Sequence, residues 1–329
     1  NVFYIVHLDS GEEIRSYARS LGPGKRAVVV GAGYVGLEMA DALAKLGLKV
    51  TVVEALSQVA PRVLDPELAQ VVEDAMKSHG VEVIKGAPVE RFEIRDGKAV
   101  AVVTGKGKIE GDMFVIGAGI EPNNDLAKRM GLRLGSSGAV EVNERTQTSN
   151  PDVYAAGDVA EHRDLVTGQM VWRPFAQIAN KMGYVTGSNL GGVDAVFEGS
   201  VGTSAFKVFG VVVARTGLSK AEAEKFGFKP IEASLTAGTK AHYIPGGSKM
   251  QLKVVADEKT GRLLGAQAVG YDDTAFWRVN VVASLLTTKG TVWDLFTADY
   301  GYQPLLSPVW DPLVIAARLL MRTLGEVRR

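Results

Sequence analysis

The glycines and the acid between residues 31 and 54 form the pattern with the clearest chemical meaning in this chain. The run Gly31-Ala32-Gly33-Tyr34-Val35-Gly36 spaces its glycines like a turn in which backbone amides approach a pyrophosphate and a helix packs close behind. Glu54 follows at the position where a carboxylate can accept hydrogen bonds from a ribose 2′-hydroxyl. The pattern predicts a dinucleotide site with the contact residues Gly31, Gly33, Tyr34, Val35, Gly36 and Glu54.

Two strands and one helix have to position these residues. The apolar run at residues 28–30 indicates a buried strand before the turn, and residues 34–46 carry apolar side chains at helical spacing up to Gly47. A second strand at residues 49–53 then places Glu54 at its end. A glycine-rich turn that serves packing alone is the alternative, but it does not explain the position of the acid.

The residues after Glu54 bear on which nicotinamide cofactor is bound. A 2′-phosphate would be repelled by the carboxylate and would need arginines close behind it, and residues 55–58 contain none. The sequence therefore predicts NADH in preference to NADPH.

Composition excludes several other functions. The 37 Lys and Arg residues balance the 37 Asp and Glu residues, so there is no electrostatic case for nucleic acid or an anionic membrane as partner. No apolar run approaches the ~18 residues of a membrane span, and we expect a cytoplasmic protein. The chain has no cysteine, and its four histidines are scattered, so we expect no metal site and no cysteine nucleophile within these residues.

The order of elements divides the chain into four parts. We expect a short junction at residues 1–22, a parallel-sheet nucleotide domain with an antiparallel hairpin turning at Asp96-Gly97 at residues 23–122, and a further part at 123–200. This third part should contain short strands near 139–142 and 153–154 and a helix at about 175–190. Residues 201–329 read as a separate α+β domain with an antiparallel sheet and closing apolar helices.

Three passages resemble one known family. Residues 31–38 (GAGYVGLE), 148–159 (TSNPDVYAAGDV) and 302–313 (YQPLLSPVWDPL) are similar to its NAD(H) fingerprint, its second flavin motif and its C-terminal signature. The family is that of the pyridine-nucleotide disulfide oxidoreductases, in the branch of NADH oxidases and coenzyme A-disulfide reductases. The resemblance is collinear over essentially the whole chain. It implies an α/β fold with a Rossmann-like NAD(H)-binding domain and a partial FAD-binding domain, followed by an α+β dimerisation domain.

The resemblance also implies roles for single residues. Asp158 would bind the ribityl chain of FAD, and the helix start at Phe175-Ala176 would face the flavin ring, where a helix N-terminus stabilises negative charge. Glu38 and Gly119 would lie at the nicotinamide end, and Tyr302 would reach across a dimer to the partner's flavin. The alternatives are a simple turn for Asp158, a solvated glutamate for Glu38 and a half-buried interface tyrosine for Tyr302.

The implied function is that of a homodimeric, FAD-dependent enzyme that passes a hydride from NADH to flavin and on to a small-molecule acceptor: a disulfide, a sulfur species or oxygen. Family members open with another dinucleotide fold and carry a redox cysteine, and residues 1–17 match the junction that follows that region. The sequence therefore resembles a family member that lacks the N-terminal FAD half-domain. Trp310 stands near a position where some coenzyme A-disulfide reductases place a lysine, which weakens the case for that substrate. The alternatives are a catalytically incomplete NAD-binding and dimerisation fragment without flavin, and a flavin-free dehydrogenase.

Overall fold

The computed structural model describes residues 1–325, and its first region (residues 1–122) is built on a parallel sheet. The strand order is β1-β8-β2-β3-β4, and every neighbouring pair is parallel. The valine-rich central strands are buried, as expected for strands covered on both faces. The elements of this sheet layer are β1 (Val2–Tyr4), α1 (Leu8–Leu21), β2 (Arg26–Val30), α2 (Tyr34–Lys45), β3 (Lys49–Val53), α3 (Pro66–Ser78), β4 (Glu82–Ile84) and β8 (Met113–Ile116).

A three-stranded antiparallel flap is inserted before β8. It consists of β5 (Val89–Arg95), β6 (Lys98–Thr104) and β7 (Gly107–Glu110). Asp96 and Gly97 connect the first two strands with φ values of 50° and 73°, the left-handed backbone that a two-residue hairpin turn requires. The predicted hairpin is therefore confirmed.

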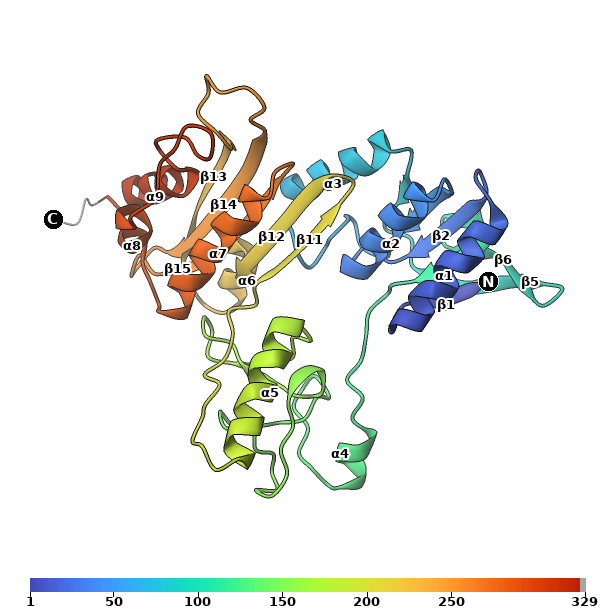
Figure 1. Cartoon of the computed structure of the whole chain (residues 1–329), viewed down its shortest axis with the longest axis horizontal. Helices are drawn as coiled ribbons and strands as arrows, with labels where there is room; N and C mark the ends of the chain where they lie inside the picture. The colour runs from blue at the N-terminus through green and yellow to red at the C-terminus, as the bar shows by residue number, and fades with distance from the viewer. Residues whose placement is uncertain (326–329) are drawn as a thin grey trace.

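The second region (residues 123–200) forms a lobe of its own, joined to the rest by two extended segments (Figure 1). It contains α4 (Asp125–Arg129), a short 3₁₀ helix η1 (Gly157–Val159), β9 (His162–Arg163), β10 (Met170–Val171) and α5 (Ala176–Leu190). The strands predicted near 139–142 and 153–154 are wrong. These segments form only isolated bridges, so no ladder develops: Val140 pairs with Leu134 and with Ala160, and Tyr154 pairs with Gln147.

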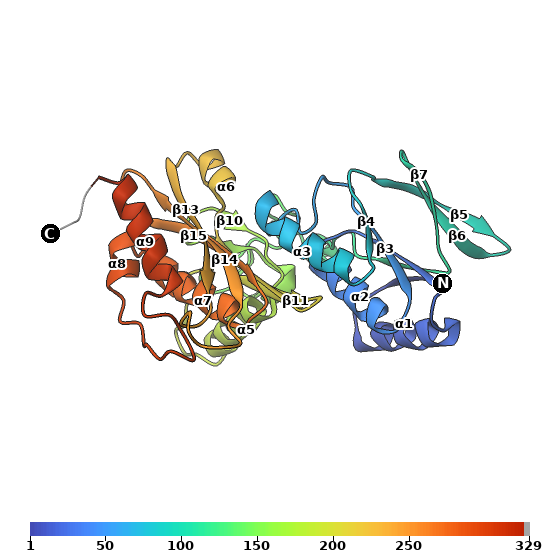
Figure 2. The same cartoon turned by 90° about the horizontal axis from the view of Figure 1, so that it is seen from above.

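The third region (residues 201–325) is the predicted α+β unit, seen on the left of Figures 1 and 2. Its antiparallel sheet has the order β11-β12-β15-β14-β13. The strands are β11 (Ser204–Val208), β12 (Val211–Gly217), β13 (Pro230–Gly238), β14 (Lys249–Asp257) and β15 (Leu263–Gly270). The helices are α6 (Lys220–Lys225), α7 (Thr274–Thr287), α8 (Val292–Thr297) and α9 (Pro312–Thr323). Helix α8 was not predicted, because its six residues show no clear period, although Thr291 and Asp294 form a capping box.

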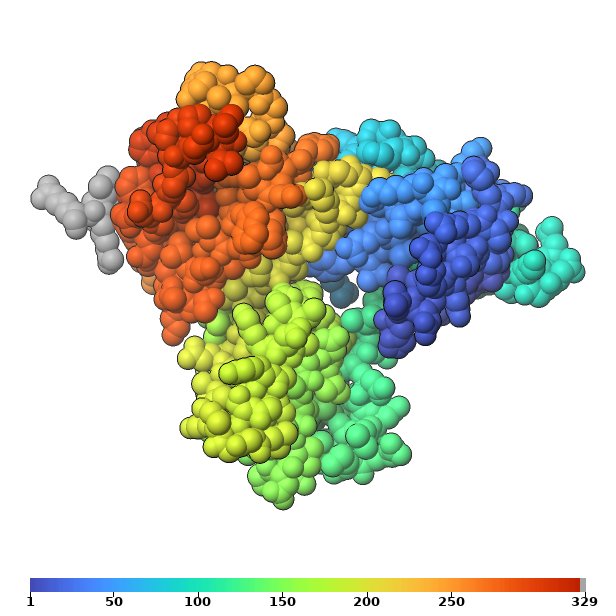
Figure 3. Space-filling view, viewed as in Figure 1, coloured from blue at the N-terminus to red at the C-terminus, as the bar shows by residue number. Residues whose placement is uncertain are grey.

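The three regions lie side by side in the space-filling view, with the second region below the contact between the other two (Figure 3). The predicted fold class, a mixed α/β chain that ends in an α+β unit, is confirmed. Within residues 1–325, none of the helices combines the length and apolar character that crossing a bilayer requires.

Candidate functional site

The glycine turn between β2 and α2 is packed so closely that two of its glycines cannot carry a side chain. A Cβ on Gly31, whose φ is 99°, would lie 2.5 Å from the carbonyl oxygen of Gly117. A Cβ on Gly36 would lie 1.9 Å from the carbonyl oxygen of Gly31. A Cβ on Gly33 would meet no atom within 4 Å. The first and third glycines therefore allow the strand, the turn and the helix to pack, while the second leaves open space above the turn.

That open space lies at the N-terminus of α2. The helix is capped by Gly33 with no side-chain hydrogen bond, and its first turn contains no acidic residue. Tyr34, Val35 and Gly36 begin the helix, so their N–H groups have no partner within it. Unpaired amides and the positive end of the helix dipole form a site for an anion, and the residues fit the pyrophosphate of a dinucleotide.

The carboxylate of Glu54 lies beside this turn, immediately after β3. It accepts hydrogen bonds from the backbone N–H of Ala32 at 2.6 Å and of Leu56 at 2.8 Å, and the residue is only 7% exposed. These bonds fix the carboxylate at the turn and leave each oxygen a further lone pair. The structure thus brings the predicted acid and the predicted glycines together.

Two further residues predicted to lie at the nicotinamide end are Glu38 on α2 and Gly119 after β8. Glu38 follows one turn into α2 and reaches solvent, and desolvation by the atoms around it raises the pKa of its carboxyl group. Gly119 follows β8 with a φ of 122°, and a Cβ there would meet nothing within 4 Å. A bound cofactor could therefore approach the backbone closely at Gly119.

The turn at Gly157–Val159 in the second region is the candidate flavin contact. Gly157 has a φ of 79°, and a Cβ there would lie 3.2 Å from the Cβ of Ala179, so the turn packs tightly on α5. Asp158 is exposed, and within residues 1–325 no hydrogen bond or ion pair engages its carboxylate. Its backbone carbonyl accepts the indole N–H of Trp172 at 2.7 Å, which fixes the turn. The carboxylate is thus exposed to solvent, as the predicted contact with a ligand hydroxyl requires.

Helix α5 starts next to this turn with properties like those of α2. Phe175 is the N-cap and gives no side-chain hydrogen bond, Ala176 is exposed, and the first turn has no acidic residue. The free amides and the helix dipole would stabilise negative charge on a reduced flavin ring. The residues present therefore fit the ribityl and ring end of FAD.

One aromatic contact brings the two helix N-termini together. The ring of Tyr34, the first residue of α2, meets the ring of Phe175, the N-cap of α5, edge to face at 6.3 Å. Tyr34 also packs on Phe206 at 5.3 Å, and its hydroxyl group is 2.6 Å from Ser204 Oγ on β11. Nothing in the spacing of these residues predicted the contact, since it joins segments far apart in the sequence.

Tyr302 lies away from this site within one chain. It belongs to the segment between α8 and α9, at the opposite end of the molecule from β2 (Figure 1). Its hydroxyl group is 3.3 Å from that of Tyr243, and this hydrogen bond raises its pKa. Tyr243 was not singled out in the sequence, because it lies in an irregular segment with no motif.

The second region also contains a cavity of about 390 Å³ that the sequence did not predict. Its lining includes His162, which is 4% exposed, and Phe197, whose ring packs on the imidazole at 5.7 Å. His162 Nε2 is 2.8 Å from Ser200 Oγ, while Nδ1 has no hydrogen-bond partner among residues 1–325. Burial, with the nearby Arg173 guanidinium, lowers the pKa of His162 from 6.5 to about 4. Within the described part of the chain, no cluster of acidic residues and histidines could hold a metal ion.

We expect His162 to make the stability of this region depend on acid. Its pKa is lower in the folded protein than in the unfolded chain, so the unfolded chain takes up a proton first as the pH falls. Neutral His162 therefore contributes about 3 kcal/mol to the free energy of unfolding. This contribution is fully present above pH 6.5 and is lost as the pH falls toward 4. Urea unfolding at pH 7.5 and 4.5 should show this loss. His162→Gln should reduce it, and an equal pH dependence in both proteins would contradict the expectation.

Family models match two long segments of the chain. Residues 1–183 match the family described as "Pyridine nucleotide-disulphide oxidoreductase", and residues 203–313 match its dimerisation domain. The chain is 42% identical over 293 residues to a CoA-dependent NAD(P)H sulfur oxidoreductase of Pyrococcus abyssi, and the match covers 89% of this chain and 65% of that protein. It is 34% identical over 325 residues to an NADH oxidase of Methanocaldococcus jannaschii, with 99% and 71% covered.

A solved structure has a similar fold over almost the whole of this chain. The NAD-dependent persulfide reductase of A. fulgidus superimposes with a TM-score of 0.94 at 35% identity, over 98% of this chain and 59% of that one. The present chain thus spans 65% of the Pyrococcus relative and 59% of this structure.

Proposed function

The chain belongs to the pyridine nucleotide-disulphide oxidoreductase family, and from that premise we propose that it is an NADH-dependent flavoprotein oxidoreductase. In this proposal a hydride passes from NADH to FAD and on to a disulfide, a sulfur species or oxygen. The supporting observation is the contact between Tyr34 and Phe175, which sets next to each other two helix N-termini that have no side-chain cap hydrogen bond. One helix starts at the dinucleotide turn and the other starts beside Asp158, so two cofactors bound there would meet.

The first region would bind NADH. The amides of Tyr34, Val35 and Gly36 would hold the pyrophosphate, and the open space above Gly33 would admit it. Glu54 would accept the ribose hydroxyls, since its carboxylate is already fixed beside the turn. Glu38 and Gly119 would border the nicotinamide.

The second region would bind FAD. Asp158 would accept hydrogen bonds from ribityl hydroxyls, and Ala176 with the other first residues of α5 would face the ring. When bound, FAD supplies the hydride-accepting chemistry. The task of the protein is to orient the nicotinamide against it, to stabilise the charge of the reduced ring and to exclude water.

The third region would make the enzyme a homodimer, since residues 203–313 match a dimerisation domain. Tyr302, paired with Tyr243, would then reach the flavin of the partner subunit. The names of the relatives point to sulfur compounds and oxygen as acceptors. The 329 residues contain no cysteine, so they supply no thiolate for a disulfide exchange step. A cytoplasmic location stays a prediction.

The acceptor can be identified directly. Protein incubated with FAD and freed of excess cofactor should consume NADH when offered coenzyme A disulfide, polysulfide or oxygen, and the fastest of the three identifies the substrate class. The Gly33→Val variant is the matched control that should remain inactive. If the FAD-loaded protein oxidised no NADH with any acceptor, the alternative of a catalytically incomplete NAD-binding and dimerisation fragment would replace the proposal.

Preference for NADH over NADPH is a separate expectation. The buried carboxylate of Glu54 would repel a 2′-phosphate, and residues 55–58 offer no arginine to compensate. We expect kcat/KM for NADH to exceed that for NADPH by about tenfold or more at low salt. Glu54→Ala should reduce the ratio of kcat/KM for NADH to kcat/KM for NADPH, chiefly by lowering kcat/KM for NADH. Equal or NADPH-favouring values in the unaltered protein would contradict the assignment of Glu54.

A further inference from the structure

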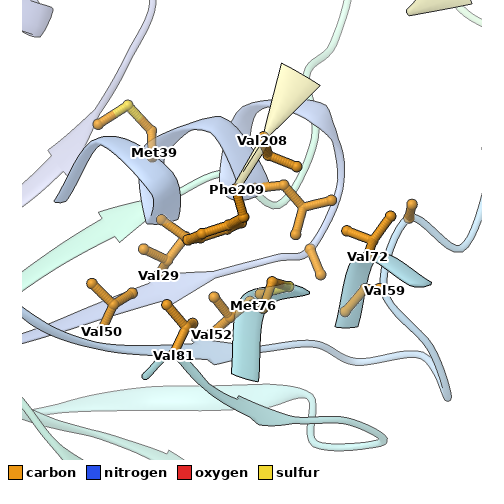
Figure 4. Close-up of a cluster of buried hydrophobic side chains, with 14 of the residues drawn as sticks. Val29, Met39, Val50, Val52, Val59, Val72, Met76, Val81, Val208 and Phe209 are labelled. Atoms are coloured by element: carbon orange, nitrogen blue, oxygen red, sulfur yellow. The ribbon is translucent and has the colours of Figure 1, made fainter. Parts of the chain in front are cut away.

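The first and third regions share one hydrophobic core. The tip of the β11–β12 hairpin enters the first region, where Val208 and Phe209 are buried with side chains of the parallel sheet and its helices. Figure 4 shows the Phe209 ring beside Val29, and the surrounding side chains come from β2, β3, α2, α3 and the segments that follow β3 and α3. At the C-terminal end of α3, the His79 ring contacts the Phe209 ring at 5.5 Å. Most of the second region has a core of its own, whose members all come from residues 127–197, and Val166 is the buried side chain that it adds to the core of the third region.

The residue at the hairpin tip is unusual for its backbone. Val208 pairs with Val211, so Phe209 and Gly210 form a two-residue turn with φ values of 51° and 79°. Such turns favour Asn-Gly, and a bulky residue in the left-handed conformation is held only where its surroundings require it. Phe209 is 2% exposed, so packing in the neighbouring region is what accounts for a phenylalanine there.

A buried cation makes a second attachment between the same two regions. Lys253 on β14 has a side chain only 7% exposed, and its Nζ lies 2.6 Å from Asp65 and 2.5 Å from Glu67 at the start of α3. It also lies 3.1 Å from Glu232 on β13. Gln267 on β15 accepts the backbone N–H of Asp65 at 2.8 Å. The start of α3 is thus fixed to the sheet of the third region by buried charge and hydrogen bonds.

We propose that Phe209 and Lys253 are positioning residues that lock the NADH-binding region onto the dimerisation region as one cooperative unit. The hydride donor is then carried in a fixed orientation on the sheet of the dimerisation region. Because the two regions open together, NADH bound at the glycine turn also raises the free energy that is needed to open that sheet. This inference rests on the proposed function only for the identity of the ligand.

Native-state amide hydrogen exchange of the full chain tests whether the first and third regions open as one unit. In the unaltered protein, the slowest amides of α3, β12 and β15 should share one opening equilibrium. NADH at 100 times its dissociation constant should slow all three sets about 100-fold. Phe209→Asn gives the Asn-Gly turn that favours the hairpin, so it removes the buried ring without disfavouring the turn. In this variant the α3 amides should exchange about 100-fold faster, and NADH should protect the first region alone.

Phe92→Asn is the matched control. Phe92 packs on Phe114 at 5.5 Å in a separate cluster of the first region, so its loss should speed exchange there while the shared response to NADH persists. Phe209→Leu, which keeps an apolar side chain, should give a smaller effect of the same sign as Phe209→Asn, and it replaces that variant if the latter does not fold.

Unequal opening equilibria in the unaltered protein would overturn the inference, as would a shared NADH response that survives Phe209→Asn. If NADH does not bind at all, the proposed function fails. The coupling of the two regions is then still tested without ligand, by comparing the amide exchange rates of the first and third regions.

Discussion

Replacing Gly33 with valine is expected to raise the dissociation constant for NADH about 100-fold while leaving thermal stability almost unchanged. The backbone of Gly33 has a φ of −77°, which any residue adopts, and a Cβ there meets no protein atom within 4 Å. The valine side chain would instead occupy the space through which a pyrophosphate reaches the amides of α2. Titration of NADH fluorescence and a thermal melt measure the two quantities.

Gly36→Ala is the control, because it is expected to reduce the stability that Gly33→Val leaves almost unchanged. Its added methyl group would lie 1.9 Å from the carbonyl oxygen of Gly31, so the turn and helix must separate. We expect a loss of about 3 kcal/mol or more in the free energy of unfolding. If Gly33→Val left NADH affinity intact, the space above the turn would not be the pyrophosphate site.

Asp158→Ala is expected to weaken FAD binding about 100-fold without destabilising the protein. A carboxylate that accepts hydrogen bonds from ligand hydroxyls contributes about 1.5–3 kcal/mol per bond. Since its carboxylate has no hydrogen-bond or ion-pair partner within residues 1–325, its removal breaks nothing inside the protein. Flavin retained after gel filtration, measured over a range of FAD concentrations, gives the effect.

Asp152→Ala supplies the control for charge alone. Asp152 is also exposed in the second region, only a few residues before Asp158, and its carboxylate makes no hydrogen bond in the described part of the chain. It should bind FAD as the unaltered protein does. Equal flavin content in the unaltered protein and in both variants would remove Asp158 from the site. Gly157-Asp158 would then be a simple turn.

Local patterns predicted the parts of the fold that depend on local rules. The strand, glycine turn, helix and second strand of residues 25–54 follow from hydrophobic period and glycine spacing, and the structure places Glu54 beside the turn as expected. The hairpin at Asp96-Gly97 follows from turn chemistry. The strands expected near 139–142 and 153–154 failed because each segment pairs with its neighbours at single residues only, and β propensity forms a strand only where the pairing continues.

Contacts between distant segments were beyond the reach of such rules. The meeting of Tyr34 with Phe175 depends on how two regions fold against each other. The burial of Phe209 in the core of another region has the same origin, and a phenylalanine at a hairpin tip signals nothing by itself. Tyr243 lies beside Tyr302 because two irregular segments of the third region pack together. Every predicted cofactor contact stays a prediction: the glycine turn at residues 31–36, Glu54, Glu38, Gly119, Asp158, Ala176 and Tyr302.

The central claim is that NADH bound at the glycine turn reduces a flavin held beside α5. It is tested most directly by adding NADH, without oxygen, to purified protein loaded with FAD and recording its visible spectrum. We expect the flavin absorption to be lost on addition of NADH, and to be retained when Gly33→Val protein receives the same concentration. A protein that binds NADH and FAD but keeps its flavin spectrum, or one that binds NADH and no flavin, would contradict the claim.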